Sequence, residues 1–399
     1  MNGLFRVPLR HMRTLVWLLL DGFVISLVAA SVPRRRVLII RPDGIGDFVL
    51  WSNAGQELCA YYRHQGYSVV LLGNAVWAEW ASDLGLADEV WALDTNRFVH
   101  NLRYRWGWLR RLRKAGFAKV LHPVHSRVFL VGDALVRSTN AEERVAPEGD
   151  CSNAFWLKRW SDSWYSRLIP ETSRQSMELL RHAEFMRGLG LSGFVARAPK
   201  LSFSKTTSEL KSISKPYVVL FVGAGLKIKV WPARNFGEIG LRLRECGINV
   251  VLAGGPMDHL QATKILECLN GNAINLVGKT NLSELAELLR NAVVVLSNDT
   301  SAVHIGAAVG TPVLCMLGGG HFGRFLPYVV EESEPFRPLP IVVVQPMSCF
   351  GCNWQCIHPR ERGEAVKCIS DISVEQVWRH VEEVLPLWTR VKERTRKGS

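Results

Sequence analysis

The most informative segment of this chain is Ser297-Asn298-Asp299-Thr300-Ser301-Ala302-Val303-His304. It joins an apolar run at 293–296 to a helix of small residues that we expect to end at Gly310. A strand that passes through a polar turn into a helix leaves backbone N–H groups unpaired at the positive end of the helix dipole. Such a turn binds anions, and we expect the side chains in it to contact the ligand. The alternative is an ordinary helix N-cap without a ligand.

Length and composition indicate a globular protein with two domains. The 399 residues exceed what one hydrophobic core usually fills, and 48% are hydrophobic while 21% are charged. The formal charge of +13 implies an acidic partner. No nucleic-acid-binding module is recognisable, so we do not expect nucleic acid as a partner. Basic residues flank an apolar N-terminal segment, which favours an anionic membrane surface.

The N-terminal apolar segment covers residues 15–30 and is interrupted by Asp21 and Gly22. It is shorter than the roughly 20 apolar residues that a spanning helix needs. We therefore expect residues 1–33 to form an amphipathic helix that associates with the membrane. A spanning helix and a helix packed on the protein itself remain the alternatives. If the segment is only an anchor, removing residues 1–32 leaves a folded protein.

Apolar runs of strand length alternate with helical patterns on both sides of a Ser- and Lys-rich segment. The first series starts at 37–40 and the second at 217–222, which is typical of parallel sheets covered by helices. We predict an α/β protein with two Rossmann-like, doubly wound domains, at 34–201 and 216–399, joined by a linker at 202–215. Two such domains place the carboxyl ends of their strands around a central cleft.

The loop after the first predicted strand carries Gly44, Gly46 and Asp47. The two glycines let a ligand approach the backbone closely. The loop is not a dinucleotide fingerprint, because Val49 stands where G-x-G-x-x-G requires glycine. Asp47 lies at a helix N-terminus, where the dipole stabilises the carboxylate as a proton acceptor. The alternative is a first-turn acid that only stabilises the helix.

Two further loops carry candidate ligand contacts. In Lys229-Val230-Trp231-Pro232, the proline keeps the tryptophan extended, so Lys229 lies in an ordered turn that suits a phosphate. Taken alone, a lysine in a loop is usually solvated. Asp258 follows a strand and Gly254-Gly255, where it either contacts a ribose or caps the next helix.

Taken together, these motifs resemble those of the lipopolysaccharide heptosyltransferases, the ADP-heptose-using glycosyltransferases of family 9, which have the GT-B fold. The resemblance covers residues 37–377, and its specificity comes from the order of the motifs. They are R-P-D-G-I-G-D at 41–47, K-V-W-P at 229–232, G-G-P-M-D at 254–258, N-L-V-G-K-T-N-L-S-E-L at 275–285 and S-N-D-T-S-A-V-H at 297–304.

The resemblance assigns roles to individual residues. It implies that Asp47 is the general base, that Lys229 binds phosphate, and that a diphosphate is held by the turn formed by Asp299, Thr300, Ser301 and His304. One position departs from the family pattern, because Ser301 stands where the family usually has glycine. The side chain at this turn narrows the space for the diphosphate or adds a hydrogen bond.

The implied function is the inverting transfer of a heptose or related sugar from ADP-heptose to a lipopolysaccharide core or similar glycolipid, with no cofactor required for catalysis. It also implies a cytoplasmic enzyme at the inner-membrane surface. We expect Arg127, within 122–127, and the region 150–167 to contact the acceptor. A sugar-nucleotide epimerase or hydrolase on the same scaffold is one alternative. A catalytically silent, metal-stabilised binding protein is the other.

Four of the nine cysteines are clustered with the spacing C-x2-C-x3-C-x11-C. Four thiolates suit a tetrahedral zinc or iron site, which would stabilise a loop without a regular core. Some heptosyltransferases that modify autotransporters are similar in carrying a cysteine-ligated iron here. Free thiols or a disulfide are the alternatives, and His358 is a weaker candidate ligand. The candidate ligands are Cys349, Cys352, Cys356 and Cys368.

Overall fold

The computed structural model describes residues 6–153, 155–171, 177–201, 213–335, 337–361 and 363–397. They form two compact units. Described residues 6–48, 54–171 and 181–194 make up the first unit, and residues 49–53, 177–180 and 195–397 make up the second. Most of the predicted linker, 202–212, lies outside the described residues.

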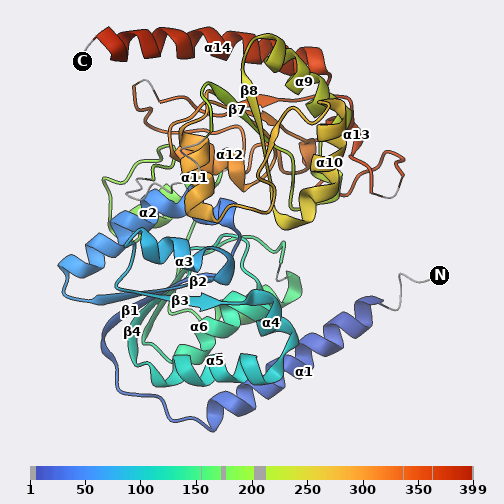
Figure 1. Ribbon diagram of the computed structural model, residues 1–399. Helices are drawn as coiled ribbons and strands as arrows, with labels where there is room; N and C mark the ends of the chain where they lie inside the picture. The colour runs from blue at the N-terminus through green and yellow to red at the C-terminus, as the bar shows by residue number, and fades with distance from the viewer. Residues whose placement is uncertain are drawn as a thin grey trace. The chain divides into compact units, whose positions relative to one another are not determined.

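The first unit is built on a six-stranded parallel sheet of order β3-β2-β1-β4-β5-β6. The predicted apolar run at 37–40 forms the centre of β1 and is fully buried, as expected for a parallel sheet covered on both faces. Helices α2 and α3 lie on one face, and α5 and α6 on the other (Figure 1). The strands are β1 Arg34–Arg41, β2 Ser68–Asn74, β3 Glu89–Leu93, β4 Phe117–Leu121, β5 Glu143–Pro147 and β6 Arg167–Ile169. The helices are α1 Arg6–Ser26, α2 Ile45–His64, α3 Ala75–Asp83, α4 Thr95–His100, α5 Leu102–Lys114, α6 Ala134–Thr139, α7 Lys158–Asp162 and α8 Glu178–Gly188.

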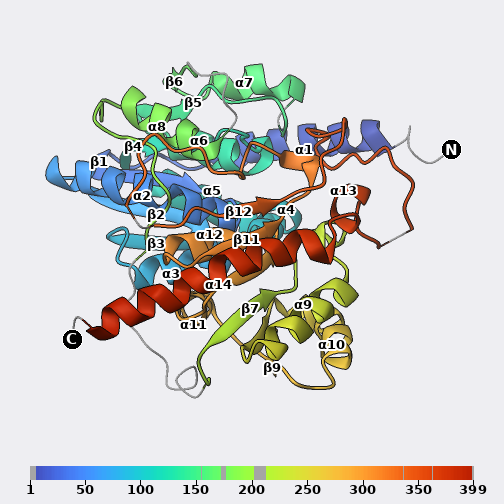
Figure 2. The ribbon, with the colours of Figure 1, turned by 90° about the horizontal axis from the view of Figure 1, so that it is seen from above.

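The second unit repeats this topology. Its parallel sheet has the order β12-β11-β10-β7-β8-β9. Read from the β9 edge, with β7 counted as the first strand, this is the same order as in the first sheet. Figure 2 shows the long helix α14 of this unit in red, and α14 contacts α9 and β11. The strands are β7 Tyr217–Phe221, β8 Asn249–Ala253, β9 Ile274–Asn275, β10 Val295–Asn298, β11 Val313–Met316 and β12 Ile341–Val343. The helices are α9 Ala233–Glu245, α10 His259–Cys268, α11 Leu282–Arg290, α12 Ser301–Ala308, α13 Lys367–Ser370 and α14 Val374–Lys397.

Both sheets therefore have the strand order of a doubly wound Rossmann fold, as predicted. In such sheets a ligand binds at the carboxyl ends of the two central strands, where the strand order reverses. These strands are β1 and β4 in the first unit and β7 and β10 in the second.

Helix α1 packs on its own unit along one face. Trp17, Leu18 and Val24 are buried, and α1 contacts α5. Asp21, expected to interrupt an apolar anchor, forms a buried ion pair with Arg105 at 2.5 Å. Removal of residues 1–32 would leave the Arg105 charge buried without its partner, so the structure argues against the expectation that these residues are dispensable for folding.

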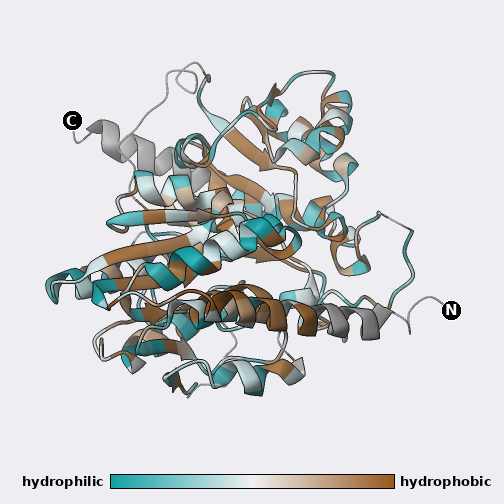
Figure 3. Cartoon of the chain, turned by 90° about the horizontal axis from the view of Figure 1, so that it is seen from below, coloured by the Kyte–Doolittle hydropathy of each residue, from teal (hydrophilic) through white to brown (hydrophobic). Residues whose placement is uncertain are grey.

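The opposite face of α1 is apolar and exposed. Leu19 and Phe23 of α1 and Leu27, directly after its last residue, recur every four residues and are 72%, 63% and 64% exposed. Figure 3 shows the described part of α1 as largely hydrophobic. In the described part of the chain, no helix combines the length and the hydropathy needed to cross a membrane.

Candidate functional site

The loop after β1 places Asp47 in the first turn of α2. Gly44 is the N-cap of α2 in an extended conformation, and the helix begins at Ile45. Gly46, predicted to lie in the loop, therefore lies inside the helix. Asp47 is half-buried. Its carboxylate thus lies close to the carboxyl end of a central strand, at the positive end of a helix.

Arg41, the last residue of β1, holds the loop between β1 and α2 through contacts of its guanidinium group. Its Nη2 pairs with Asp43 Oδ2 at 2.8 Å and donates to the backbone oxygen of Asp47 at 3.2 Å. Its Nη1 donates to the backbone oxygen of Pro123, which follows β4. A single guanidinium therefore joins the ends of β1 and β4. Arg41 is part of the motif at 41–47, but no role was predicted for it. A charged residue at the end of a buried strand could have identified it as a candidate site residue.

Arg127 belongs to a buried hydrogen-bond network. Its guanidinium pairs with Asp162, lies 3.6 Å from Asp133 and stacks on Tyr165 at 4.6 Å. Tyr165 Oη donates to Asp133 at 2.6 Å and is joined to His122 Nδ1 at 2.7 Å. Arg127 is 2% exposed, so the structure assigns its charge to internal contacts. Its role in acceptor binding stays a prediction.

His125, from the same predicted acceptor region, lies in a second cluster. Its Nδ1 contacts Glu171, and its Nε2 lies 3.4 Å from Asp150 Oδ2. Burial lowers the pKa of His125, but the hydrogen bonds to Asp150 and Glu171 outweigh it and raise the pKa above its usual value. The region therefore holds a histidine that stays protonated more readily than an exposed one.

In the second unit, Asn298 joins the three segments that meet at the reversal of strand order. Its Nδ2 donates to the backbone oxygens of Val222 and Gly223, both at 3.0 Å. Its Oδ1 accepts from the backbone N–H of Trp231 at 2.8 Å. The Trp231 indole is fully buried and donates to Ile372 O at 2.9 Å. The loop of Lys229 is therefore fixed to the ends of β7 and β10.

This anchoring brings together Lys229 and Asp299, which are 70 residues apart in sequence. Lys229 ends a single 3-10 turn, and its Nζ pairs with Asp299 Oδ2 at 2.8 Å. The two side chains are only 14% and 7% exposed. The described structure therefore holds an ammonium group, largely shielded from solvent, directly before the start of α12.

The turn predicted to bind an anion forms as expected, with Thr300 as the N-cap of α12. Within the described structure, the Thr300 side chain makes no capping hydrogen bond. His304 lies one turn further and is 4% exposed, with its Nδ1 joined to Tyr328 Oη at 2.8 Å. The pKa of His304 is lowered to about 4, mainly by burial; the charge of Asp299 opposes this shift and that of Lys229 adds to it. His304 is thus neutral at pH 7, and Ser301 is half-buried beside it.

Asp258 forms a local cap. Its Oδ2 accepts from the backbone N–H of Gly255 at 2.8 Å. A Cβ at Gly223, which follows β7, would lie 1.8 Å from the same oxygen, so the carboxylate packs directly against that strand end. The carboxylate therefore closes the 3-10 turn Pro256–Asp258, and in the described structure it makes no cap hydrogen bond to the following helix α10. Contact with a ribose stays a prediction.

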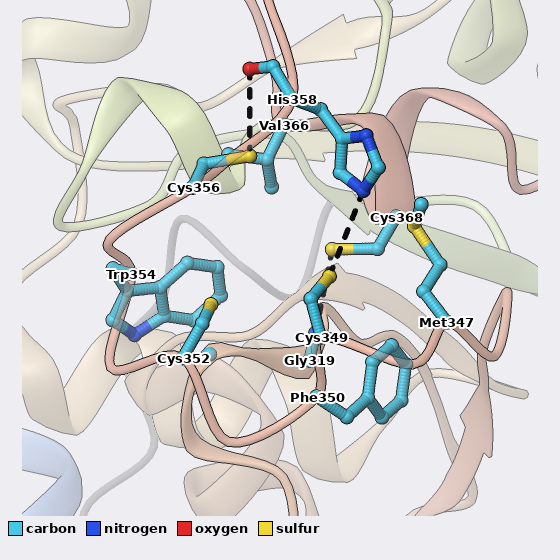
Figure 4. A pocket seen from close by; sticks show the side chains of 11 residues that line it. Gly319, Met347, Cys349, Phe350, Cys352, Trp354, Cys356, His358, Val366 and Cys368 are labelled. Carbon is cyan, nitrogen blue, oxygen red and sulfur yellow. Dashed lines mark hydrogen bonds between the residues drawn. The ribbon is translucent and has the colours of Figure 1, made fainter.

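The four clustered cysteines and His358 line one pocket (Figure 4). Cys349 Sγ lies 3.8 Å from His358 Nε2, and Cys368 Sγ accepts from Gly319 N at 3.4 Å. All nine cysteines are free. As the side chains of the described residues stand, no three ligand-type groups are arranged to hold a metal ion.

The chain is similar in sequence and in fold to known heptosyltransferases. The family model for glycosyltransferase family 9 (heptosyltransferase) matches residues 170–333. Lipopolysaccharide heptosyltransferase 3 of Escherichia coli K12 is 34% identical over 264 residues, which is 63% of this chain and 70% of that protein. The solved structure of E. coli ADP-heptose LPS heptosyltransferase II has a TM-score of 0.62 at 17% identity, covering 88% of this chain and 99% of that chain.

The iron-containing dodecameric heptosyltransferase TibC, solved with ADP-D-beta-D-heptose, has a TM-score of 0.53 at 16% identity and covers 90% of this chain and 78% of that chain. Some sequence alignments are shorter. The chain spans 27% of the length of lipooligosaccharide heptosyltransferase 2 of Haemophilus influenzae and 55% of that of a second E. coli lipopolysaccharide heptosyltransferase 3. The E. coli K12 relative nevertheless aligns over more than two thirds of its length. The chain therefore belongs to glycosyltransferase family 9, the heptosyltransferase family.

Proposed function

We propose that the protein transfers a heptose or closely related sugar from ADP-heptose to a lipopolysaccharide core or similar glycolipid, with inversion at the anomeric carbon. The observation that carries this proposal is the Lys229–Asp299 pair at the start of α12. It supplies a shielded cation beside helix-start amides, which is what a diphosphate leaving group needs.

In the proposed step, an acceptor hydroxyl attacks the anomeric carbon while Asp47 takes its proton. The bond between the anomeric carbon and the phosphate oxygen breaks, and ADP leaves with the bonding electrons. Lys229, the hydroxyls of Thr300 and Ser301 and the first amides of α12 stabilise the charge on the leaving diphosphate. Because these groups stabilise the leaving diphosphate, the proposed mechanism requires no catalytic metal ion.

Incubation with ADP-heptose and a core glycolipid tests the proposal against its two alternatives. Transfer of the sugar to the glycolipid supports it, with the product linkage analysed by NMR for inversion. Breakdown or epimerisation of the donor without transfer would favour the epimerase or hydrolase. Neither reaction, with ADP still bound, would favour a silent binding protein.

We propose that the cysteine cluster holds a structural zinc or iron ion. Four thiols and an imidazole face one pocket, and this donor set suits either metal. Burial and the other three thiols raise the pKa of Cys368, although the Gly319 amide lowers it, so a cation would be needed to hold that thiolate. The ion would stabilise the loop and take no part in transfer. Metal analysis of the purified protein and of Cys352→Ser tests this: a metal-free wild-type protein with free thiols would contradict it.

We also propose that the protein acts at the cytoplasmic face of the inner membrane, held there by the exposed face of α1. Leu19, Phe23 and Leu27 form a stripe of the kind that inserts shallowly into a bilayer, and exposed Arg34 and Arg35 suit anionic lipid. The wild type should sediment with phosphatidylglycerol vesicles, and Leu19→Glu with Phe23→Glu should release it. Leu260→Glu, at an exposed leucine of α10, is the control. Equal sedimentation of all variants would contradict the proposal.

A further inference from the structure

The loop between Cys349 and Cys356 folds onto the glycine turn that follows β11. The backbone N–H of Gly351 donates to Gly319 O at 2.8 Å, and that of Asn353 donates to Gly320 O at 3.0 Å. A Cβ at Gly320 would lie 2.3 Å from the indole of Trp354. The absence of a side chain at Gly320 therefore allows the Trp354 ring to lie against the turn.

The Trp354 ring also lies against Lys229. The Lys229 Nζ is 4.3 Å from the ring centroid and, on another side, 2.8 Å from Asp299 Oδ2. His321 contacts the ring edge-on at 5.9 Å and is joined to Asn353 Oδ1 at 2.6 Å. The ammonium is thus held between an aromatic face and a carboxylate. Lysine has a flexible four-carbon side chain, so these two contacts restrict where its charge can lie.

We propose that Trp354 is a positioning residue for Lys229 in donor binding. The inference rests on the proposed function, because it assumes that Lys229 binds the donor diphosphate. Trp354 lies between Cys352 and Cys356 and lines the cysteine pocket (Figure 4), so a change in the conformation of this loop would move the ring that contacts Lys229. The ring does not react and acts only through Lys229.

The test measures the Kd for ADP by calorimetry in Trp354→Ala, Trp354→Phe, Lys229→Ala and the double variant Trp354→Ala with Lys229→Ala. Trp354→Ala should weaken ADP binding by about three- to tenfold, the range expected for a partly shielded cation–π contact. Trp354→Phe should recover most of that loss, since it restores an aromatic face. All three residue types carry a Cβ at this left-handed position, φ 62°, so backbone strain is common to them. Trp106→Ala, at a half-buried tryptophan of α5 in the first unit, controls for the loss of a tryptophan.

The double variant separates a positioning role from a structural one. If Trp354 acts through Lys229, adding Trp354→Ala to Lys229→Ala should cause no further loss of ADP affinity. The same fold-loss in both backgrounds, or no loss in Trp354→Ala alone, would overturn the inference. If instead Lys229→Ala itself leaves ADP affinity unchanged, the donor site of the proposed function fails, which is a distinguishable result.

Discussion

Lys229 Nζ lies 2.8 Å from Asp299 Oδ2, so the cation expected to bind the donor phosphates is already paired in the described structure. In the proposed donor complex, a diphosphate at the start of α12 would share this ammonium with the Asp299 carboxylate. In that proposal, Asp299 holds the cation in place. Neutralising Lys229 removes the attraction and leaves Asp299 to repel the ligand.

The first prediction is that Lys229→Ala abolishes the stabilisation of the protein by ADP. A ligand present at 100 times its Kd stabilises the folded state by about 2.7 kcal/mol, which is seen as a rise in Tm. We expect this rise in the wild type and in Lys227→Ala, which removes an exposed lysine from the same 3-10 turn. Equal shifts in Lys229→Ala and the wild type would place the phosphates elsewhere.

The second prediction concerns the pH dependence of stability. The pKa of His304 is lowered to about 4 in the fold, so below pH 6.5 the unfolded chain takes up a proton that the folded chain does not. The stabilising contribution of neutral His304 is complete above pH 6.5 and falls as the pH decreases toward 4. The free energy of unfolding of the wild type, measured by urea denaturation, should therefore drop relative to His304→Gln over this window. A difference between the two proteins that does not vary with pH would show that His304 titrates normally.

The third prediction is that the buried ion pair of α1 is required for folding stability. Asp21→Asn keeps the volume of the side chain but leaves Arg105 charged and 0% exposed, which should cost about 3–5 kcal/mol in the free energy of unfolding. Glu332→Gln removes one partner of the exposed pair with Arg197 and should cost at most about 1 kcal/mol. Similar costs for the two variants would mean that α1 is not integral to the first unit.

The sequence predicted the central strands well because these are continuous apolar runs, and the observed strands at 37–40 and 217–221 are fully or almost fully buried. Strands β5, β6 and β12 were not predicted. β6 and β12 have three residues each and lie at sheet edges, where the run is too short for its hydrophobic periodicity to be recognised. β5 has five residues and lies inside the sheet, but only its last three residues are buried. Gly46 was assigned to the loop before α2, although the helix already begins at Ile45.

The sequence predicted individual residues of the candidate site but not which of them lie together. Asp47, Lys229 and Thr300 each carry a local signal of a strand end or helix start. That Lys229 pairs with Asp299 and lies against Trp354 depends on strand order and on a loop 125 residues further along the chain, and no local pattern encodes it. Likewise, the sequence does not reveal that Arg127 lies beside the buried carboxylate of Asp133.

The rate of heptose transfer by Asp47→Asn is the most direct test of the proposal that Asp47 is the general base. Asparagine keeps the shape of the side chain at the start of α2 but cannot accept the acceptor proton, so the rate of heptose transfer from ADP-heptose to a core glycolipid should fall by about 10²–10⁴-fold. The Kd for ADP should stay within about twofold of the wild type, since the donor contacts proposed here come from the second unit. Transfer at a near-normal rate by Asp47→Asn would contradict the account and remove Asp47 from the mechanism.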